Sequence, residues 1–85
     1  MPSRTVTVGS ASGLHARPAA LFVKAAADSG LAVTISRPDG DAVDARSILS
    51  VLSLDVRHGE EVVLSADGPE ADNALTRLAE LLAHG

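Results

Sequence analysis

Phe22 is the only aromatic residue of this chain, and cysteine is absent altogether. Neither disulfides nor large rings can therefore stabilise it, and its core has to be built from Ala, Val, Leu and Ile around a single phenyl ring. A chain of 85 residues has the length of one compact domain, so we expect residues 1–85 to form a single domain. The lack of cysteine also excludes a thiolate metal site.

Charge and hydropathy narrow the classes of function. The formal net charge is −4, and a chain with so few rings lacks both the cationic surface and the stacking platforms of nucleic-acid-binding proteins. No apolar run approaches the length of a membrane span, and the N-terminus lacks the basic-then-apolar pattern of a signal peptide. We therefore expect a cytoplasmic protein that neither binds nucleic acid nor inserts into membranes, and nothing in the sequence suggests more than a monomer.

Periodicity predicts the order of the structural elements. Alternating, β-branched segments predict strands at residues 4–8, 31–36, 42–44 and 61–66. Helical spacing predicts helices at residues 16–27 and 47–54, and a third whose first residue is Pro69. Turn-forming residues at 38–41 join the second and third strands as a hairpin. The order β-α-β-β-α-β-α indicates an α+β fold, with helices on one face of a mostly antiparallel sheet.

The first predicted helix has two unlike faces. One is a core face, formed by Ala19, Phe22, Val23 and Ala26. The opposite face places Leu21 between the cations Arg17 and Lys24. A single exposed leucine is common and needs no explanation, so the alternative to a docking face is an ordinary surface residue.

The second predicted helix also presents apolar side chains that can be either a docking face or ordinary surface residues, because such side chains surround it almost completely. Eight residues on the outside of a small domain cannot bury them all, and we expect Leu49 and Leu52 to be exposed. If they lie near Leu21, the domain carries one apolar patch, with Arg17, Lys24 and Arg46 at its rim. A patch of this kind usually marks an interaction site.

His15 stands immediately before the first helical turn, which contains Pro18. The amides of Ala16 and Arg17 then have no intrahelical acceptor, so the start of this helix is an anion site. Its positive end favours the neutral, nucleophilic imidazole. After phosphorylation, the same amides and the Arg17 guanidinium would hold the phosphoryl oxygens. The pattern therefore predicts a histidine that carries a phosphoryl group, the alternative being an ordinary polar residue at a helix cap.

The other two histidines are weaker candidates for a functional site, since His58 lies in a turn and His84 at the C-terminus. The three do not have the spacing of metal ligands, and no acidic residue pairs with them in sequence. We expect no metal and no cofactor.

Several segments resemble the HPr family, the histidine phosphocarriers of the bacterial phosphoenolpyruvate-dependent sugar phosphotransferase system. Residues 13–20, Gly-Leu-His-Ala-Arg-Pro-Ala-Ala, resemble its active-site signature, and residues 46–54 look like its second signature, which contains a regulatory serine. Residues 59–62 and 65–68 are similar to its last strand and turn, so the resemblance extends over essentially the whole chain. It implies an open-faced β-sandwich, in which three helices cover one face of a four-stranded antiparallel sheet.

The resemblance also implies a function. Enzyme I would phosphorylate His15 on Nδ1, with phosphoenolpyruvate as ultimate donor, and the phosphoryl group would pass to the IIA domain of a sugar transporter. The chain would be a carrier rather than an enzyme, with Arg17 assisting the phosphohistidine. The implied partner surface consists of Leu21, Lys24, Ser47, Ile48, Leu49 and Leu52.

Ser47 matches the serine that an ATP-dependent kinase phosphorylates in some bacteria, and it can equally be a plain helix N-cap. Two alternatives to the sugar-system carrier stay open. One is a paralogue that serves a nitrogen-related or regulatory relay. The other is a binding regulator that acts on transcriptional regulators or enzymes through the Ser47 surface, although His15 and Arg17 argue against this as the sole role.

Overall fold

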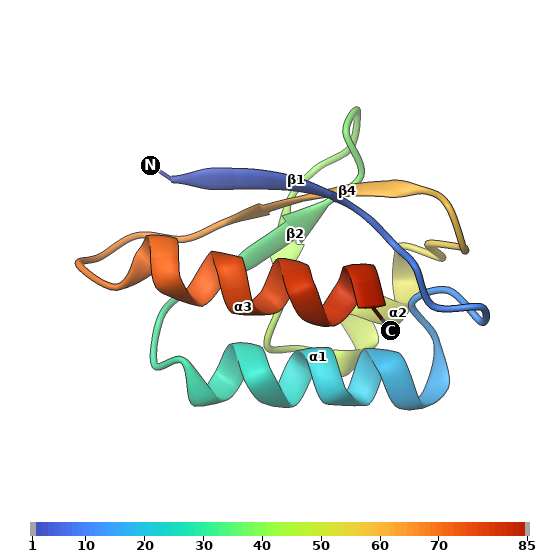
Figure 1. The fold of residues 1–85 in the computed structure, drawn as a ribbon, viewed down its shortest axis with the longest axis horizontal. Coiled ribbons are helices and arrows are strands. Elements are labelled where there is room, and N and C mark those ends of the chain that lie inside the picture. Colours follow the sequence, from blue (N-terminus) through green and yellow to red (C-terminus); the bar gives the residue numbers. More distant parts are fainter. Residues whose placement is uncertain (1, 85) are drawn as a thin grey trace.

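The computed structural model describes residues 2–84, which form a four-stranded antiparallel sheet and three α-helices. The elements are β1 (Ser3–Thr7), α1 (Ala16–Asp28), β2 (Thr34–Ser36), β3 (Val43–Asp44), α2 (Ile48–Ser53), β4 (Glu61–Ser65) and α3 (Ala71–His84). All three helices lie on one face of the sheet, and the other face is open (Figure 1). The predicted order and the open-faced sandwich are confirmed.

The sheet has the strand order β1-β4-β2-β3, so β4 lies between β1 and β2. Its register pairs Val6 with Val62 and Ile35 with Leu64. The predicted hairpin of β2 and β3 is present, and its turn is closed by the Gly40 amide, which donates to the Arg37 carbonyl (3.0 Å).

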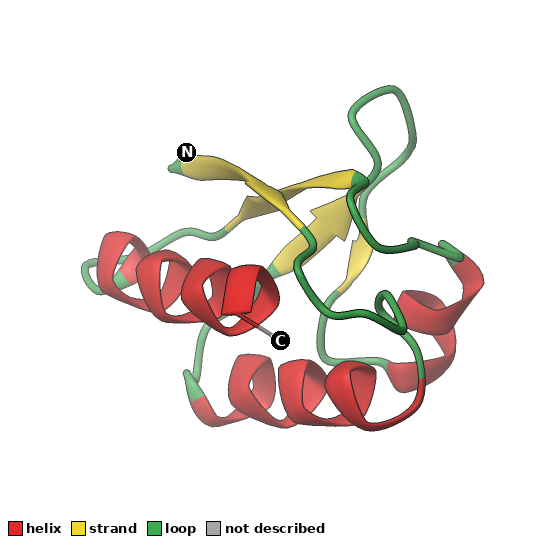
Figure 2. Ribbon diagram, turned by 45° about the vertical axis from the view of Figure 1, so that its right-hand side comes forward, coloured by secondary structure: helices red, strands yellow, loops and turns green. Residues whose placement is uncertain are grey.

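The core lies between the sheet and the helices, with Phe22 fully buried. Helix α1 buries Ala19, Phe22 and Ala26, as its predicted core face requires, and Val23 is half-buried at the edge of the core. Figure 2 shows α1 and α3 side by side beneath the sheet, with α2 at the N-terminal end of α1. No helix within residues 2–84 combines the length and the apolar character needed to cross a bilayer.

Two predicted element starts differ from the structure by two residues or more, and the other boundaries agree to within one residue. Helix α3 begins at Ala71 rather than Pro69, because the Ala71 amide donates to the Gly68 carbonyl (3.1 Å) and closes a turn before the helix. The first α-helical bond joins the Ala74 amide to the Glu70 carbonyl. Strand β2 begins at Thr34 rather than residue 31, since the Leu31 amide is still occupied by the Ser29 hydroxyl at the end of α1.

Candidate functional site

His15 is held at the start of α1 by the loop that follows β1. The Leu14 amide donates to the Val56 carbonyl (2.9 Å), and the Leu14 side chain is fully buried, so the loop is anchored directly before the histidine. His15 is the N-cap residue, with an extended backbone, but its side chain makes no capping hydrogen bond. The side chain is 37% exposed and is therefore accessible to a partner.

Next to the imidazole, the helix offers free amides. Ala16, Arg17 and Pro18 are the first three residues of α1, and within residues 2–84 no acceptor binds the amides of Ala16 or Arg17. These are the groups that a helix N-terminus presents to an anion. Ala16 has a φ of 49°, in the left-handed region that a non-glycine residue seldom adopts. This bend, which the sequence did not predict, lies between the histidine and the helix.

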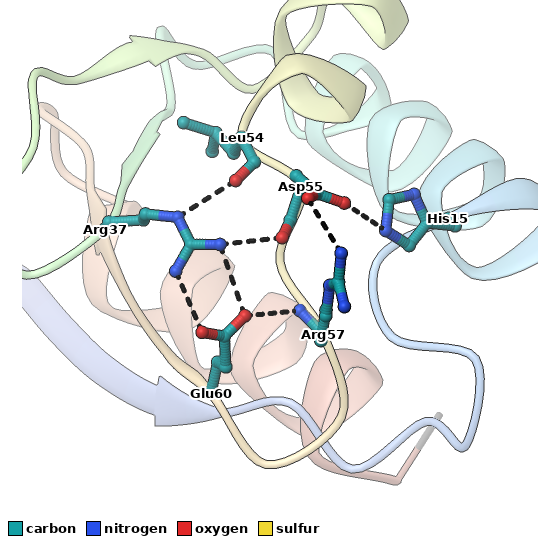
Figure 3. A network of polar contacts seen from close by, with 6 residues as sticks. All are labelled: His15, Arg37, Leu54, Asp55, Arg57 and Glu60. Atoms are coloured by element: carbon teal, nitrogen blue, oxygen red, sulfur yellow. Dashed lines mark hydrogen bonds and ion pairs between the residues drawn. The ribbon is translucent and has the colours of Figure 1, made fainter.

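Asp55 is the residue that the sequence analysis missed. Its Oδ1 lies 3.1 Å from Nε2 of His15. Figure 3 shows the two side chains pointing toward each other. Asp55 follows the end of α2 and also has a φ of 49°. A neutral imidazole carries one N–H, and a carboxylate at Nε2 accepts it there, which leaves the lone pair on Nδ1.

Arg37 binds the same segment from the other side. Its Nε donates to the Leu54 carbonyl (2.9 Å) and its Nη2 to the Asp55 carbonyl (2.6 Å). Its guanidinium also forms two bonds with Glu60, of 3.1 and 3.2 Å, and Glu60 accepts from the Arg57 amide (2.8 Å). These contacts surround the turn that carries Asp55 (Figure 3).

Acid is expected to weaken the fold through Glu60. The Arg37 hydrogen bonds, followed by the Arg57 amide, hold the pKa of Glu60 below its ordinary value. A carboxylate with a depressed folded pKa stabilises the fold above its unfolded value, about 4.3, and loses that contribution as the pH falls through the folded pKa. The pKa of Asp44 is lowered in the same way, mainly by its hydrogen bond with Arg46.

Urea unfolding at pH 7, 5 and 3 measures this effect. We expect the midpoint to fall between pH 5 and 3, and Glu60→Gln to lower it at pH 7 and to flatten its pH dependence. A Glu60→Gln protein whose midpoint follows the parent's at every pH would contradict the assignment.

Two of the three cations predicted around the apolar patch are paired with carboxylates. Nζ of Lys24 lies 2.9 Å from Oδ2 of Asp28, and this hydrogen bond raises the pKa of Lys24. Nε of Arg46 lies 3.0 Å from Oδ1 of Asp44. Arg17 is exposed, and no carboxylate within residues 2–84 pairs with it. Of the three, Arg17, two residues after His15 in sequence, is thus the cation that no carboxylate of residues 2–84 pairs with.

Large apolar side chains are exposed on α1 and α2, which pack against each other. The exposed fractions are 52% for Leu21, 38% for Ile48 and 78% for Leu49. The expectation that Leu52 is exposed is wrong: it is half-buried, because the end of α2 that holds the buried Val51 also packs Leu52 against the core. That the exposed side chains form one docking patch stays a prediction.

The remaining predicted residues occupy ordinary positions. Ser47 is the N-cap of α2, and its hydroxyl accepts from the Ser50 amide (3.3 Å), so the capping interpretation is confirmed. Its phosphorylation stays a prediction. Nδ1 of His58 lies 3.1 Å from the Ser10 carbonyl. In the part of the chain from residue 2 to 84, no three His, Asp or Glu side chains are grouped as metal ligands would be.

Comparison with known proteins bears on this site. A family model described as the PTS HPr component phosphorylation site matches residues 2–84. The phosphocarrier protein HPr of Streptomyces coelicolor is 53% identical over 85 residues, covering all of this chain and 91% of its own. The phosphocarrier protein HPr of Haloferax volcanii is 46% identical over 80 residues, covering 93% of this chain and 90% of its own.

The fold agrees with a solved structure as well. The crystal structure of a phosphocarrier protein HPr from Bacillus anthracis superposes with a TM-score of 0.90, at 36% identity and with 95% of each chain covered. Sequence and fold match along nearly the full length, and the stretch that the family model describes as a phosphorylation site contains the histidine at the start of α1. The chain therefore belongs to the HPr family of phosphocarrier proteins.

Proposed function

We propose that this chain accepts a phosphoryl group on Nδ1 of His15 from Enzyme I, with phosphoenolpyruvate as ultimate donor, and passes it to a IIA domain of a sugar transporter. The observation that carries the proposal is the position of His15: an accessible imidazole at the start of α1, beside two amides that no acceptor within residues 2–84 binds. Arg17, which no carboxylate within residues 2–84 neutralises, supplies the adjacent positive charge.

Each transfer moves one phosphoryl group and no proton. The Nδ1 lone pair attacks phosphorus, and the N–P bond forms as the bond between phosphorus and the donor atom of Enzyme I breaks. The amides of Ala16 and Arg17 then face the phosphoryl oxygens, while Nε2 keeps its hydrogen. On donation, the electron pair of the N–P bond returns to Nδ1. Such transfer depends on position and charge, which partner enzymes can complete, so the chain acts as a carrier rather than an enzyme.

The exposed apolar side chains suggest where partners dock. Leu21, Ile48 and Leu49 lie on the two helices nearest His15, and desolvation of such side chains stabilises protein interfaces. Phosphorylation of Ser47, directly before Ile48, would add a dianion to this surface. We propose that such a modification would weaken docking of acidic partners, because like charges would have to be desolvated together.

The proposal is tested by incubating the chain with Enzyme I and phosphoenolpyruvate. We expect one acid-labile phosphate per chain and, after addition of a IIA protein, its transfer to that protein. Incorporation of an acid-stable phosphate, or none at all, would contradict the proposal. Enzyme I and IIA proteins from the sugar and nitrogen-related systems, compared in parallel, distinguish the two relays.

Arg17→Glu is expected to slow phosphoryl acceptance by roughly tenfold or more. The change removes a charge-assisted hydrogen bond to the phosphoryl group, a contribution of about 1.5–3 kcal/mol, and places an anion beside it. Arg77→Glu is the matched control, since it makes the same change of charge at an exposed position of α3, which lines a pocket together with Asp28 and Ser29 at the end of α1 away from His15. Stopped-flow or quench-flow labelling measures both rates. Equal slowing in the two variants would assign the effect to net charge rather than to Arg17.

A further inference from the structure

We infer that Asp55 is a positioning residue for His15, and that Arg37 and Glu60 hold Asp55 in place. The inference rests on the proposed function, because it assigns a role in the phosphoryl transfer at His15. It starts from one contact, between Oδ1 of Asp55 and Nε2 of His15 at 3.1 Å.

The backbone of Asp55 is unusual for its residue type. It directly follows Leu54, the C-cap of α2, and has a φ of 49°. Glycine is the common residue at this position of a helix end, because a Cβ makes the left-handed conformation costly. Aspartate tolerates that conformation better than most residues but less well than glycine. The side chain that glycine would lack is the one that reaches His15, which gives the backbone outlier a functional explanation.

The carboxylate matches what both directions of transfer require. By accepting the hydrogen of Nε2, it keeps the lone pair on Nδ1, the atom that attacks phosphorus. When the N–P bond forms, the ring gains positive charge, and Asp55 compensates it without taking the proton. When the phosphoryl group leaves, the bonding electron pair returns to Nδ1 and Asp55 keeps the same contact. An aspartate that orients a histidine and stabilises its cationic form plays the same part in catalytic triads.

Arg37, Glu60 and Arg57 hold the backbone and the carboxylate of Asp55 in place. Arg37 donates to two successive carbonyls, those of Leu54 and Asp55, while its other edge pairs with Glu60. Only a planar guanidinium can hold these groups at once, because its donors form a rigid fork. Nη2 of Arg57 lies 3.4 Å from Oδ2 of Asp55, so both carboxylate oxygens have partners (Figure 3).

Asp55→Gly separates positioning from folding. It removes the carboxylate and also relieves the left-handed strain, so we expect the variant to be at least as stable as the parent. Phosphoryl acceptance should slow by roughly three- to tenfold, a discounted effect for a half-exposed pair. Ring ¹⁵N spectra of the neutral, unphosphorylated His15 should move from the Nε2–H form in the parent toward a mixture of tautomers. Identical ring shifts and identical rates in the two proteins would overturn the inference.

Asp55→Asn is the second variant, because asparagine also tolerates the left-handed conformation. Its side-chain oxygen can still accept from Nε2 but carries no charge. We expect the Nε2–H form to be retained and the rate to lie between those of the parent and Asp55→Gly. A rate equal to the parent's would show that the charge of Asp55 is irrelevant and would overturn that part of the inference.

The role of Arg37 is tested by combining substitutions. Arg37→Gln should slow acceptance and mix the tautomers in the parent, but should change neither in the Asp55→Gly background, since Arg37 acts through Asp55. Equal slowing in both backgrounds would overturn this role. Arg37→Lys keeps the charge but not the fork, and we expect it to behave like Arg37→Gln; full activity with lysine would refute the argument from guanidinium geometry.

The two proposals fail in different ways. The ring spectra are recorded without Enzyme I, so they report on Asp55 whether or not the chain is a phosphate acceptor. If no phosphate reaches His15 in the parent, the proposed function is wrong. If His15 is phosphorylated and Asp55→Gly changes neither tautomer nor rate, the proposed function stands and the role of Asp55 is wrong.

Discussion

Replacing His15 with alanine is expected to abolish phosphoryl acceptance from Enzyme I while leaving the fold intact. The substitution removes the imidazole that accepts the phosphoryl group, and alanine offers no nucleophilic atom in its place, so no slower route through this side chain remains. Stability should change by less than about 1 kcal/mol, because the side chain is half-exposed and makes no capping hydrogen bond. Labelling with phosphoenolpyruvate, read by mass spectrometry, and urea unfolding of the same sample measure the two quantities.

His58→Ala is the matched control for this experiment. Like His15, His58 is accessible, and its Nδ1 contacts the Ser10 carbonyl in the loop between β1 and α1. We expect His58→Ala to accept one phosphate at nearly the rate of the parent. Undiminished labelling of His15→Ala would reject the assignment of His15, and loss of labelling only in His58→Ala would move the acceptor to that residue.

The part of the site that the sequence predicted is the part formed by neighbours in the chain. A histidine before a proline-containing helix start, followed by an arginine, determines which amides are free and where positive charge lies, whatever the rest of the fold does. The structure places His15, Ala16 and Arg17 at the start of α1 accordingly. The same locality explains why the Ser47 cap and the core face of α1 were predicted correctly.

The part that could not be predicted depends on segments far apart in sequence. Asp55 meets His15 only because Val56 pairs with Leu14 across the loop, and Arg37 reaches Asp55 only because the β2–β3 hairpin lies beside the end of α2. The one local signal was an aspartate at a helix end where glycine is common. The prediction that Leu52 is exposed was wrong for a related reason. Periodicity shows which residues share a face of a short helix, but it does not show which face the core covers.

Gly13→Ala is expected to be the most destabilising of the substitutions considered, at about 3 kcal/mol or more. Gly13 has a φ of 71°, where any Cβ is strained, and a Cβ there would lie 2.6 Å from the Val56 carbonyl oxygen and 2.8 Å from Cα of Arg57. Both are backbone atoms, so neither can rotate away. The strain alone accounts for about 1 kcal/mol, and the overlap supplies the rest by forcing two packed segments apart. Such a loss is a large fraction of the stability of a small domain.

Gly59→Ala isolates the overlap from the strain. Gly59 has a φ of 85°, but a Cβ there would meet no atom within 4 Å, so we expect a cost of only about 1 kcal/mol. Urea unfolding of the two variants measures the difference. Because the segment displaced by Gly13→Ala also carries Asp55, the ring ¹⁵N signals of His15 should shift in Gly13→Ala and stay unchanged in Gly59→Ala. Equal destabilisation of the two variants, with unchanged His15 signals in both, would mean that the contact between Gly13 and Val56 does not hold the histidine in place.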